Sequence, residues 1–167
     1  MKSLQERIAF KNPVKVECFD KDGNLKWTEE VFNGVVDEGI NQLLDDGFNG
    51  GAQTFATAYI GLVDNSGFSA FANADTMASH AGWTESQDYA EATRVAWNPD
   101  AAASRAVTNS TTVDFTMNAT KTIKGIFITS NSTKGGTTGT LWATAAFTSN
   151  ASVVSSDVLK VTYTVSG

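Results

Sequence analysis

The chain has 167 residues and a formal net charge of -6, from 18 acidic and 12 basic side chains. This length fits one domain with a sizeable core, and the lack of a dense Lys/Arg run argues against nucleic-acid binding. The single cysteine, Cys18, excludes an intramolecular disulfide, and no apolar stretch approaches the roughly 20 residues that a membrane helix needs.

The first residues are weakly patterned and lack the apolar core of a signal peptide. Leu4, Ile8 and Phe10 are spaced to line one side of a short helix. We expect residues 1–12 to form an N-terminal arm and residues 13–167 to form a single β-rich domain.

Two alternating runs, from Pro13 to Phe19 and from Leu25 to Phe32, predict a β-hairpin with one solvent-facing side. The segment between them, residues 20–24, contains Asp22-Gly23, which is a strong turn signal. This segment also resembles the start of a calcium loop. Val31 occupies the position where such a loop needs Glu, so the turn interpretation is favoured.

An amphipathic helix is predicted over about Val35 to Asp46. Two acidic residues in its first turn suit the helix dipole, and Gly47 is a plausible C-cap. We expect its apolar stripe to pack on a sheet. The stripe consists of Val36, Ile40, Leu43 and Leu44.

The nearly continuous apolar run from Phe55 to Asp64 predicts a strand buried on both faces. Residues 65–92 lack a period but are rich in aromatics, which predicts a long, ordered, irregular loop. Within it, Asp75 is expected to cap a single helical turn at Thr76 to Ser79. After a short strand at Thr93 to Trp97, a loop is predicted at residues 100–110. Further strands are predicted at Val113–Met117, Ile123–Thr129, Leu141–Thr148 and Leu159–Val165. The predicted fold is mostly β: an antiparallel β-sandwich or barrel-like domain with one short amphipathic helix and a long ordered loop.

The sequence offers little for catalysis or cofactor binding. His80 is the only histidine, and its neighbour Ser79 is too close in sequence to predict catalytic geometry. One cysteine and one histidine do not make a structural zinc site. The acidic residues of the long loop are best explained as solvated charges. We therefore predict no catalytic, cofactor or metal site.

Aromatic residues concentrate in and after the long loop, with Arg94 among them. They either close one end of the β core or form an interface with another subunit, and both can hold together. Arginine combined with aromatics is the usual composition of an interface. The candidate interface residues are Leu4, Ile8, Phe10, Phe68, Phe71, Trp83, Arg94 and Trp97.

Several segments resemble small virion proteins of tailed bacteriophages. The resemblance spans roughly Val14 to Gly167 and departs from the family pattern at Val95, where a proline is expected. The segments are Tyr59–Asp64, Phe68–Phe71, Ala74–Glu85, Tyr89–Trp97, Ile123–Gly125 and Ser130–Gly136.

Within that family, the resemblance favours a capsid decoration, or cement, protein. It implies a non-enzymatic protein that is made in the bacterial cytoplasm and binds the exterior of an icosahedral shell. Its partner would be the major capsid protein, with self-association on the shell and no direct contact with nucleic acid or membrane.

Three other interpretations stay open. The chain could be a tail or fibre component of the same virion. It could be a carbohydrate-binding β-sandwich for host adsorption, with Trp83 and Trp97 stacking on sugars. An enzyme is the least favoured, because it would depend on His80 or on a carboxylate pair.

Overall fold

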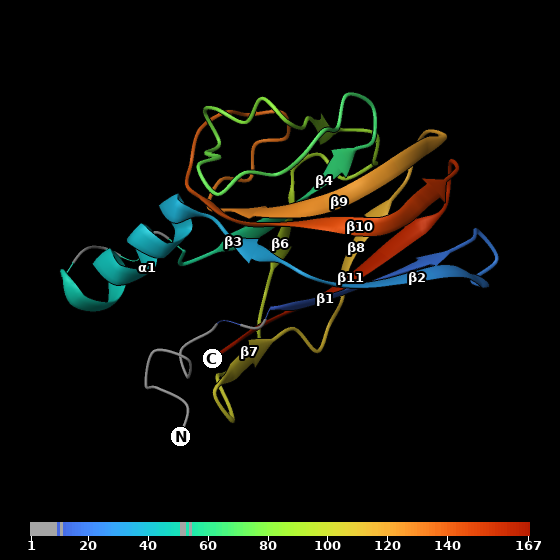
Figure 1. Cartoon of the computed structure of the whole chain (residues 1–167). Coiled ribbons are helices and arrows are strands. Elements are labelled where there is room, and N and C mark those ends of the chain that lie inside the picture. The colour runs from blue at the N-terminus through green and yellow to red at the C-terminus, as the bar shows by residue number, and fades with distance from the viewer. Residues whose placement is uncertain (1–9, 11, 51–52, 54) are drawn as a thin grey trace, which may run out of the picture.

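The computed structural model describes residues 10, 12–50, 53 and 55–167 and contains two antiparallel β-sheets that face each other (Figure 1). The elements in chain order are β1 (Pro13–Phe19), β2 (Leu25–Phe32), β3 (Gly34–Val35), α1 (Asp37–Phe48), β4 (Ala58–Asp64), β5 (Glu85–Ser86), β6 (Val95–Trp97), β7 (Ala106–Thr108), β8 (Val113–Thr116), β9 (Lys121–Thr129), β10 (Leu141–Val153) and β11 (Val158–Ser166). Sheet one has the order β2-β1-β11-β7, and β8 also pairs with β11. Sheet two has the order β3-β10-β9-β4-β5, and β6 also pairs with β4.

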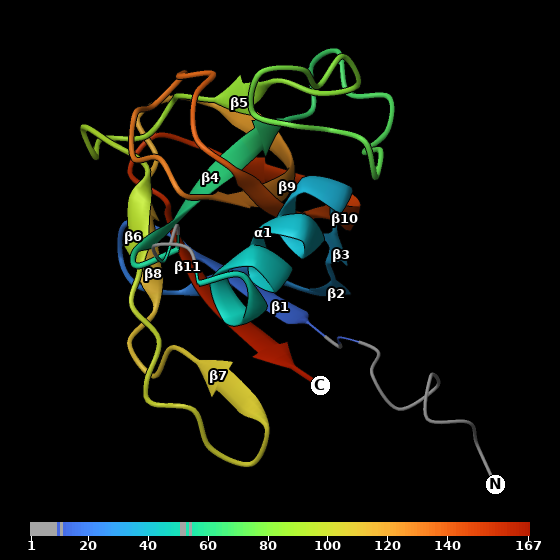
Figure 2. The same ribbon diagram turned by 90° about the vertical axis from the view of Figure 1, so that its left-hand side faces the viewer.

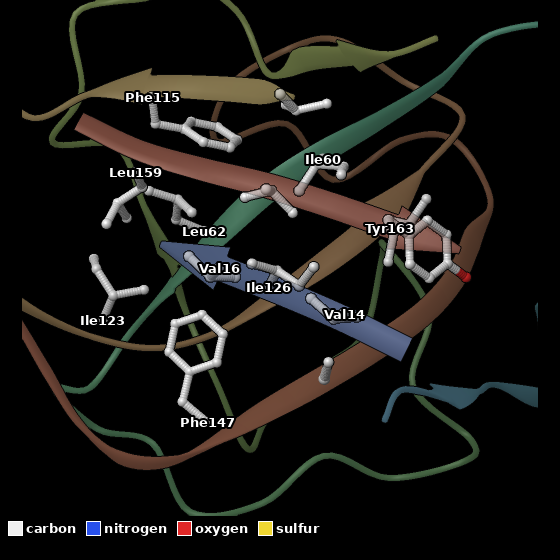
Figure 3. Close-up of a cluster of buried hydrophobic side chains, with 14 of the residues drawn as sticks. Val14, Val16, Ile60, Leu62, Phe115, Ile123, Ile126, Phe147, Leu159 and Tyr163 are labelled. Carbon is white, nitrogen blue, oxygen red and sulfur yellow. The ribbon is translucent and has the colours of Figure 1, made fainter. Parts of the chain in front are cut away.

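The main core lies between the two sheets (Figure 3). Strands β1 and β11 turn alternate side chains inward, so Val16 and Val161 are fully buried opposite each other. Ile60 and Leu62 of β4 and Ile126 of β9 meet them from sheet two. The mostly β, antiparallel, sandwich-like prediction is therefore confirmed, and the described strands do not close into a barrel.

The predicted hairpin is β1 and β2, joined by the turn at residues 20–24. Gly23 has a φ of 83°, which suits glycine. The Asp20 carboxylate accepts hydrogen bonds from the backbone N–H groups of Asp22 and Asn24, each at 2.9 Å. This carboxylate stabilises the turn, and the turn interpretation is confirmed.

Sheet two is covered on its outer face as well. The loop between β4 and β6 lies over this face (Figure 2) and buries Met77 and Trp83 against Val63 and Phe127. Gly61 of β4 sits directly beneath the Phe127 ring, where any Cβ would overlap the ring atoms. The prediction that β4 is buried on both faces is confirmed, and so is the long, ordered, irregular loop.

Two local predictions are wrong. Thr76 to Ser79 is not a helical turn but a tight turn closed by an antiparallel bridge, with Thr76 N–H donating to the Ser79 carbonyl at 3.0 Å. The Asp75 carboxylate does not cap it, because the carboxylate is engaged by the Trp83 indole N–H at 3.0 Å. The predicted loop at residues 100–110 contains β7, which extends sheet one beside the end of β11.

The helix is present but lies differently from the prediction. It runs from Asp37 to Phe48, so Gly47 is inside it and Asn49 is the C-cap. The first turn of the helix contacts sheet two: a Cβ at Gly39 would overlap the Trp142 backbone, and the Glu38 carboxylate accepts a hydrogen bond from the Leu141 N–H at 2.8 Å. Of the predicted stripe, Val36 is buried and Ile40 is half-buried, whereas Leu43 and Leu44 are exposed. The expectation that the whole stripe packs on the sheet is therefore wrong.

Candidate functional site

One end of the sandwich is open and apolar. β1 and β4 begin there, β9 and β11 finish there, and α1 projects beside it (Figure 1). A pocket of about 530 Å³ enters the structure between the two sheets at this end. We call this region the pocket end. The pocket is lined by Phe10, Leu43, Asp46, Gly47, Gln53, Phe55, Ala56, Ala58, Trp97, Pro99, Val107, Ile128, Trp142 and Val165.

Aromatic rings form much of the pocket. Phe10 and Phe55 both pack edge-on against Trp142, with centroid distances of 6.2 and 5.9 Å. Trp97 packs against Tyr163 at 5.0 Å. Such contacts fix the rings in place and add to the stabilisation from burial alone.

The polar atoms of these aromatic side chains are bonded inside the protein. Trp142 Nε1 donates to the Tyr163 hydroxyl at 2.8 Å, and Trp97 Nε1 donates to Asn109 Oδ1 at 2.9 Å. Burial raises the pKa of the Tyr163 hydroxyl, so this group stays protonated across the physiological range. Both indole N–H groups are already paired, so the tryptophans offer the pocket their apolar surface.

Exposed apolar side chains lie in and beside the pocket. On α1, Phe48 is 88% exposed and Leu44 51%, and Leu43 and Phe10, which line the pocket, are also exposed. Three other large apolar residues of the described chain are this exposed: Phe32, Leu25 and Val154. Phe32 lines a separate hollow over β1, β2 and β11, whereas Leu25 and Val154 lie toward the opposite end, beside the β1–β2 turn and just before β11 starts. A concentration of this kind on one end is typical of an interaction surface.

The charge at the pocket end is acidic. Helix α1 carries four acidic side chains and no Lys or Arg. Asp46 is the only charged residue that lines the pocket within the described chain. The described residues also contain no group of three His, Cys, Asp or Glu side chains that could hold a metal ion. The pocket is therefore lined mostly by apolar side chains, with one carboxylate at its edge.

The structure divides the predicted interface residues into two groups. Phe10 and Trp97 both line the pocket, although 87 positions separate them in sequence. Leu4 and Ile8 fall outside the described residues. Phe68, Phe71 and Trp83 lie instead in the cluster on the outer face of sheet two. The sequence pattern alone does not show which of these residues lie at the pocket end and which lie on the outer face of sheet two.

Phe68, Phe71 and Trp83 pack with Phe127 of β9, and we call these four residues the outer cluster. The rings follow one another at centroid distances of 5.1, 5.7 and 5.0 Å. Trp83 is only 2% exposed, so the structure places it inside the outer cluster rather than on a surface. Phe68 and Phe71 are half-buried and close the outer cluster.

Arg94, another candidate interface residue, has a fully buried side chain. Its Nε and Nη2 donate to the Glu85 carboxylate at 2.9 and 2.8 Å. Its Nη1 and Nη2 also donate to the carbonyls of Asn131 and Gly136, while the guanidinium lies 5.0 Å from the Phe127 ring centroid. Arg94 therefore fastens the long loop to the β9–β10 loop.

The only histidine, His80, and the only cysteine, Cys18, both contact buried parts of the protein. The His80 ring stacks on Trp83 at 3.9 Å, and its Nδ1 lies 3.1 Å from the Trp83 carbonyl oxygen. Burial raises the pKa of the Cys18 thiol to about 12, helped by the negative charge of Asp157 beside it. The thiol is therefore a poor nucleophile at neutral pH.

The sequence analysis missed Phe48, Phe55 and Trp142 as site residues. Phe48 immediately follows the predicted C-cap Gly47, and Trp142 lies in a strand whose direction in the sandwich the sequence does not give. The available signal was the helix stripe, which extends beyond the first turn, where Glu38 and Gly39 contact sheet two.

Comparison of the chain with protein-family models, with curated proteins and with solved structures found no match. Within the described part of the chain, no helix is long and apolar enough to cross a membrane.

Proposed function

We propose that the chain is a non-enzymatic structural protein that docks through its pocket end onto another protein. The observation that carries the proposal is an apolar pocket lined by Phe10 and Leu43, with the exposed Leu44 and Phe48 on the same helix as Leu43. Aromatic and aliphatic side chains of this kind are what a protein interface buries at its centre.

We further propose that the partner is the outer surface of a tailed-bacteriophage capsid, which makes the chain a decoration protein located on the virion. The support for this partner is the sequence resemblance over residues 14–167. The net charge of -6 is compatible with it, because a charged exterior keeps free copies apart before they bind.

Binding of this kind needs no strong individual contact. A protein that binds only the assembled shell stabilises the assembled state by mass action. Many symmetric copies, together with any contacts between them, would convert modest contacts into a stable coat. An interface based on a few exposed side chains at one end of the molecule is sufficient for this mode.

Cryo-electron microscopy of virions that contain the chain is the first test. Density repeating over the capsid exterior, with the pocket end toward the shell, is the expected result. Density confined to the tail would replace this proposal with the tail or fibre alternative, and no density on the particle would refute a virion role.

A pair of matched variants tests the docking surface. Leu44→Gln with Phe48→Gln removes exposed apolar area from the pocket end without adding charge. Leu25→Gln with Val154→Gln makes the same change at the opposite end. In a capsid co-sedimentation assay, we expect the first pair to weaken binding about 10-fold or more and the second to bind normally. Equal behaviour of the two pairs would contradict the proposed surface.

The carbohydrate-binding alternative receives no support from the geometry. Trp83 is buried under the loop, and the indole N–H of Trp97 is already bonded to Asn109. Trp97 still presents its ring to the pocket, but the pair of tryptophans expected to stack on a sugar does not share one surface.

A further inference from the structure

We propose that Asn49 is a site of spontaneous deamidation, at which the side-chain amide becomes a carboxylate, whereas Asn33 is protected by the fold. The chain contains two Asn-Gly pairs, and each follows a phenylalanine, at residues 32–34 and 48–50. Because the two tripeptides are identical, their local sequence gives them the same reactivity. A difference between them in the folded protein therefore comes from structure.

The reaction needs only the asparagine amide, the next backbone nitrogen and water. The Gly50 nitrogen forms a bond to Asn49 Cγ and the Cγ–Nδ2 bond breaks, so that ammonia leaves with the proton of the Gly50 N–H and a cyclic imide remains. Water then opens the ring. Cleavage at Cγ gives aspartate, and cleavage at the main-chain carbonyl carbon gives isoaspartate. Glycine favours ring closure because it has no Cβ to obstruct the approach and turns freely about its backbone bonds.

The surroundings of Asn49 leave this reaction open. Asn49 is the C-cap of α1, and both Asn49 and Gly50 are exposed. Gly50 has a φ of 69°, and a Cβ placed on it would meet open space. Asn49 Nδ2 donates to Asp45 Oδ1 at 3.3 Å at the surface, a long hydrogen bond that water can readily replace.

Asn33 is held on both sides. Its Nδ2 donates to the Tyr163 hydroxyl at 2.8 Å, and its backbone N–H donates to the Asn12 carbonyl at 3.1 Å. Gly34 belongs to β3 and pairs with Thr144 of β10. The Asn33 Oδ1 atom is buried, away from the water that the second step consumes. Ring closure at Asn33 requires β3 to separate from β10, and the free energy of that local opening slows the reaction.

Conversion of Asn49 changes the end of α1 that carries Phe48. The new carboxylate places a negative charge beside Asp45 and at the C-terminus of a helix, where negative charge is unfavourable. It also has no N–H to donate to Asp45. Isoaspartate further inserts a methylene group into the main chain directly after Phe48. Deamidation therefore weakens docking through the pocket end, a consequence that rests on the proposed function, whereas the reaction itself needs no partner.

Mass spectrometry of the folded protein, aged at mildly alkaline pH, tests the reaction. Cleavage after glutamate separates the two asparagines, because Glu38 lies between them. We expect the Asn49 peptide to convert at least about 10-fold faster than the Asn33 peptide in the folded protein. In urea-unfolded protein the two rates should become similar. Equal rates in the folded protein, faster conversion of Asn33, or conversion of Asn49 only after unfolding would each overturn the proposal.

Two variants test the consequence for docking. Asn49→Asp reproduces the aspartate product, and Asn49→Gln keeps an uncharged amide on a longer side chain. In the capsid co-sedimentation assay, we expect Asn49→Asp to bind several-fold more weakly and Asn49→Gln to bind normally. Equal binding of these two variants, when Leu44→Gln with Phe48→Gln does weaken binding, would overturn the effect of deamidation on docking alone. Normal binding of that double variant would instead overturn the docking surface itself.

Discussion

The outer cluster and the pocket end both collect aromatic side chains on sheet two, but only the outer cluster is closed. The loop between β4 and β6 contributes Phe68, Phe71 and Trp83 to the outer cluster, and the buried Arg94–Glu85 pair holds that loop against sheet two. At the pocket end, α1 contacts sheet two through Glu38 and Gly39 and leaves Leu44 and Phe48 exposed. An aromatic-rich segment can therefore contribute to stability where other residues bury it, or to recognition where it stays exposed.

The largest loss of stability is expected when the Arg94–Glu85 ion pair, which holds the loop of the outer cluster in place, is removed. Arg94→Ala leaves the Glu85 carboxylate, only 7% exposed, without its charged partner. We expect a loss of about 3–5 kcal/mol in the free energy of unfolding, measured by urea denaturation. Arg105→Ala, at an exposed position, is the matched control and should change stability by less than about 0.5 kcal/mol. Similar losses of stability in the two variants would contradict the role of Arg94 in holding this loop in place.

The second prediction concerns how tightly the side chains pack on the outer face of sheet two. Gly61→Ala introduces a methyl group directly under the Phe127 ring, which cannot move freely between Trp83 and Arg94. We expect a loss of about 2–3 kcal/mol in the same assay, because overpacking forces neighbouring side chains away from their preferred rotamers. Gly34→Ala is the control, since its Cβ would meet open space. An unchanged midpoint for Gly61→Ala would show that the outer cluster is loosely packed.

A smaller loss of stability is expected from a change between the two sheets, at the base of the pocket. Tyr163→Phe removes the hydroxyl that accepts from both Trp142 Nε1 and Asn33 Nδ2, each at 2.8 Å. We expect a loss of about 1–2 kcal/mol, because buried donors are left without an acceptor. The fluorescence of Trp142 should shift as its indole loses this bond. Tyr59→Phe, in which the replaced tyrosine is only half-buried, is the control for the loss of a hydroxyl.

The sequence predicted the strands well because alternation is a local property. β1 and β2 were found from the period-two pattern around Asp22-Gly23, and the double burial of β4 from its unbroken apolar run. The role of Arg94 could not be predicted, since Glu85 and the Gly136 carbonyl reach it only through the tertiary fold. The exposure of Leu44 was missed for the same reason. Periodicity identifies an apolar face but does not say what covers it.

The double variant Leu44→Gln with Phe48→Gln is expected to weaken binding most and to change stability least. Leu44→Gln with Phe48→Gln replaces exposed side chains on the last turns of α1, and glutamine is a good helix former. We expect the free energy of unfolding to change by less than about 0.5 kcal/mol, in contrast to Arg94→Ala. Urea denaturation of the double variant, beside Leu25→Gln with Val154→Gln, provides the comparison. A loss above about 2 kcal/mol would mean that these side chains pack against the rest of the chain, which would make the pocket end a second closed cluster.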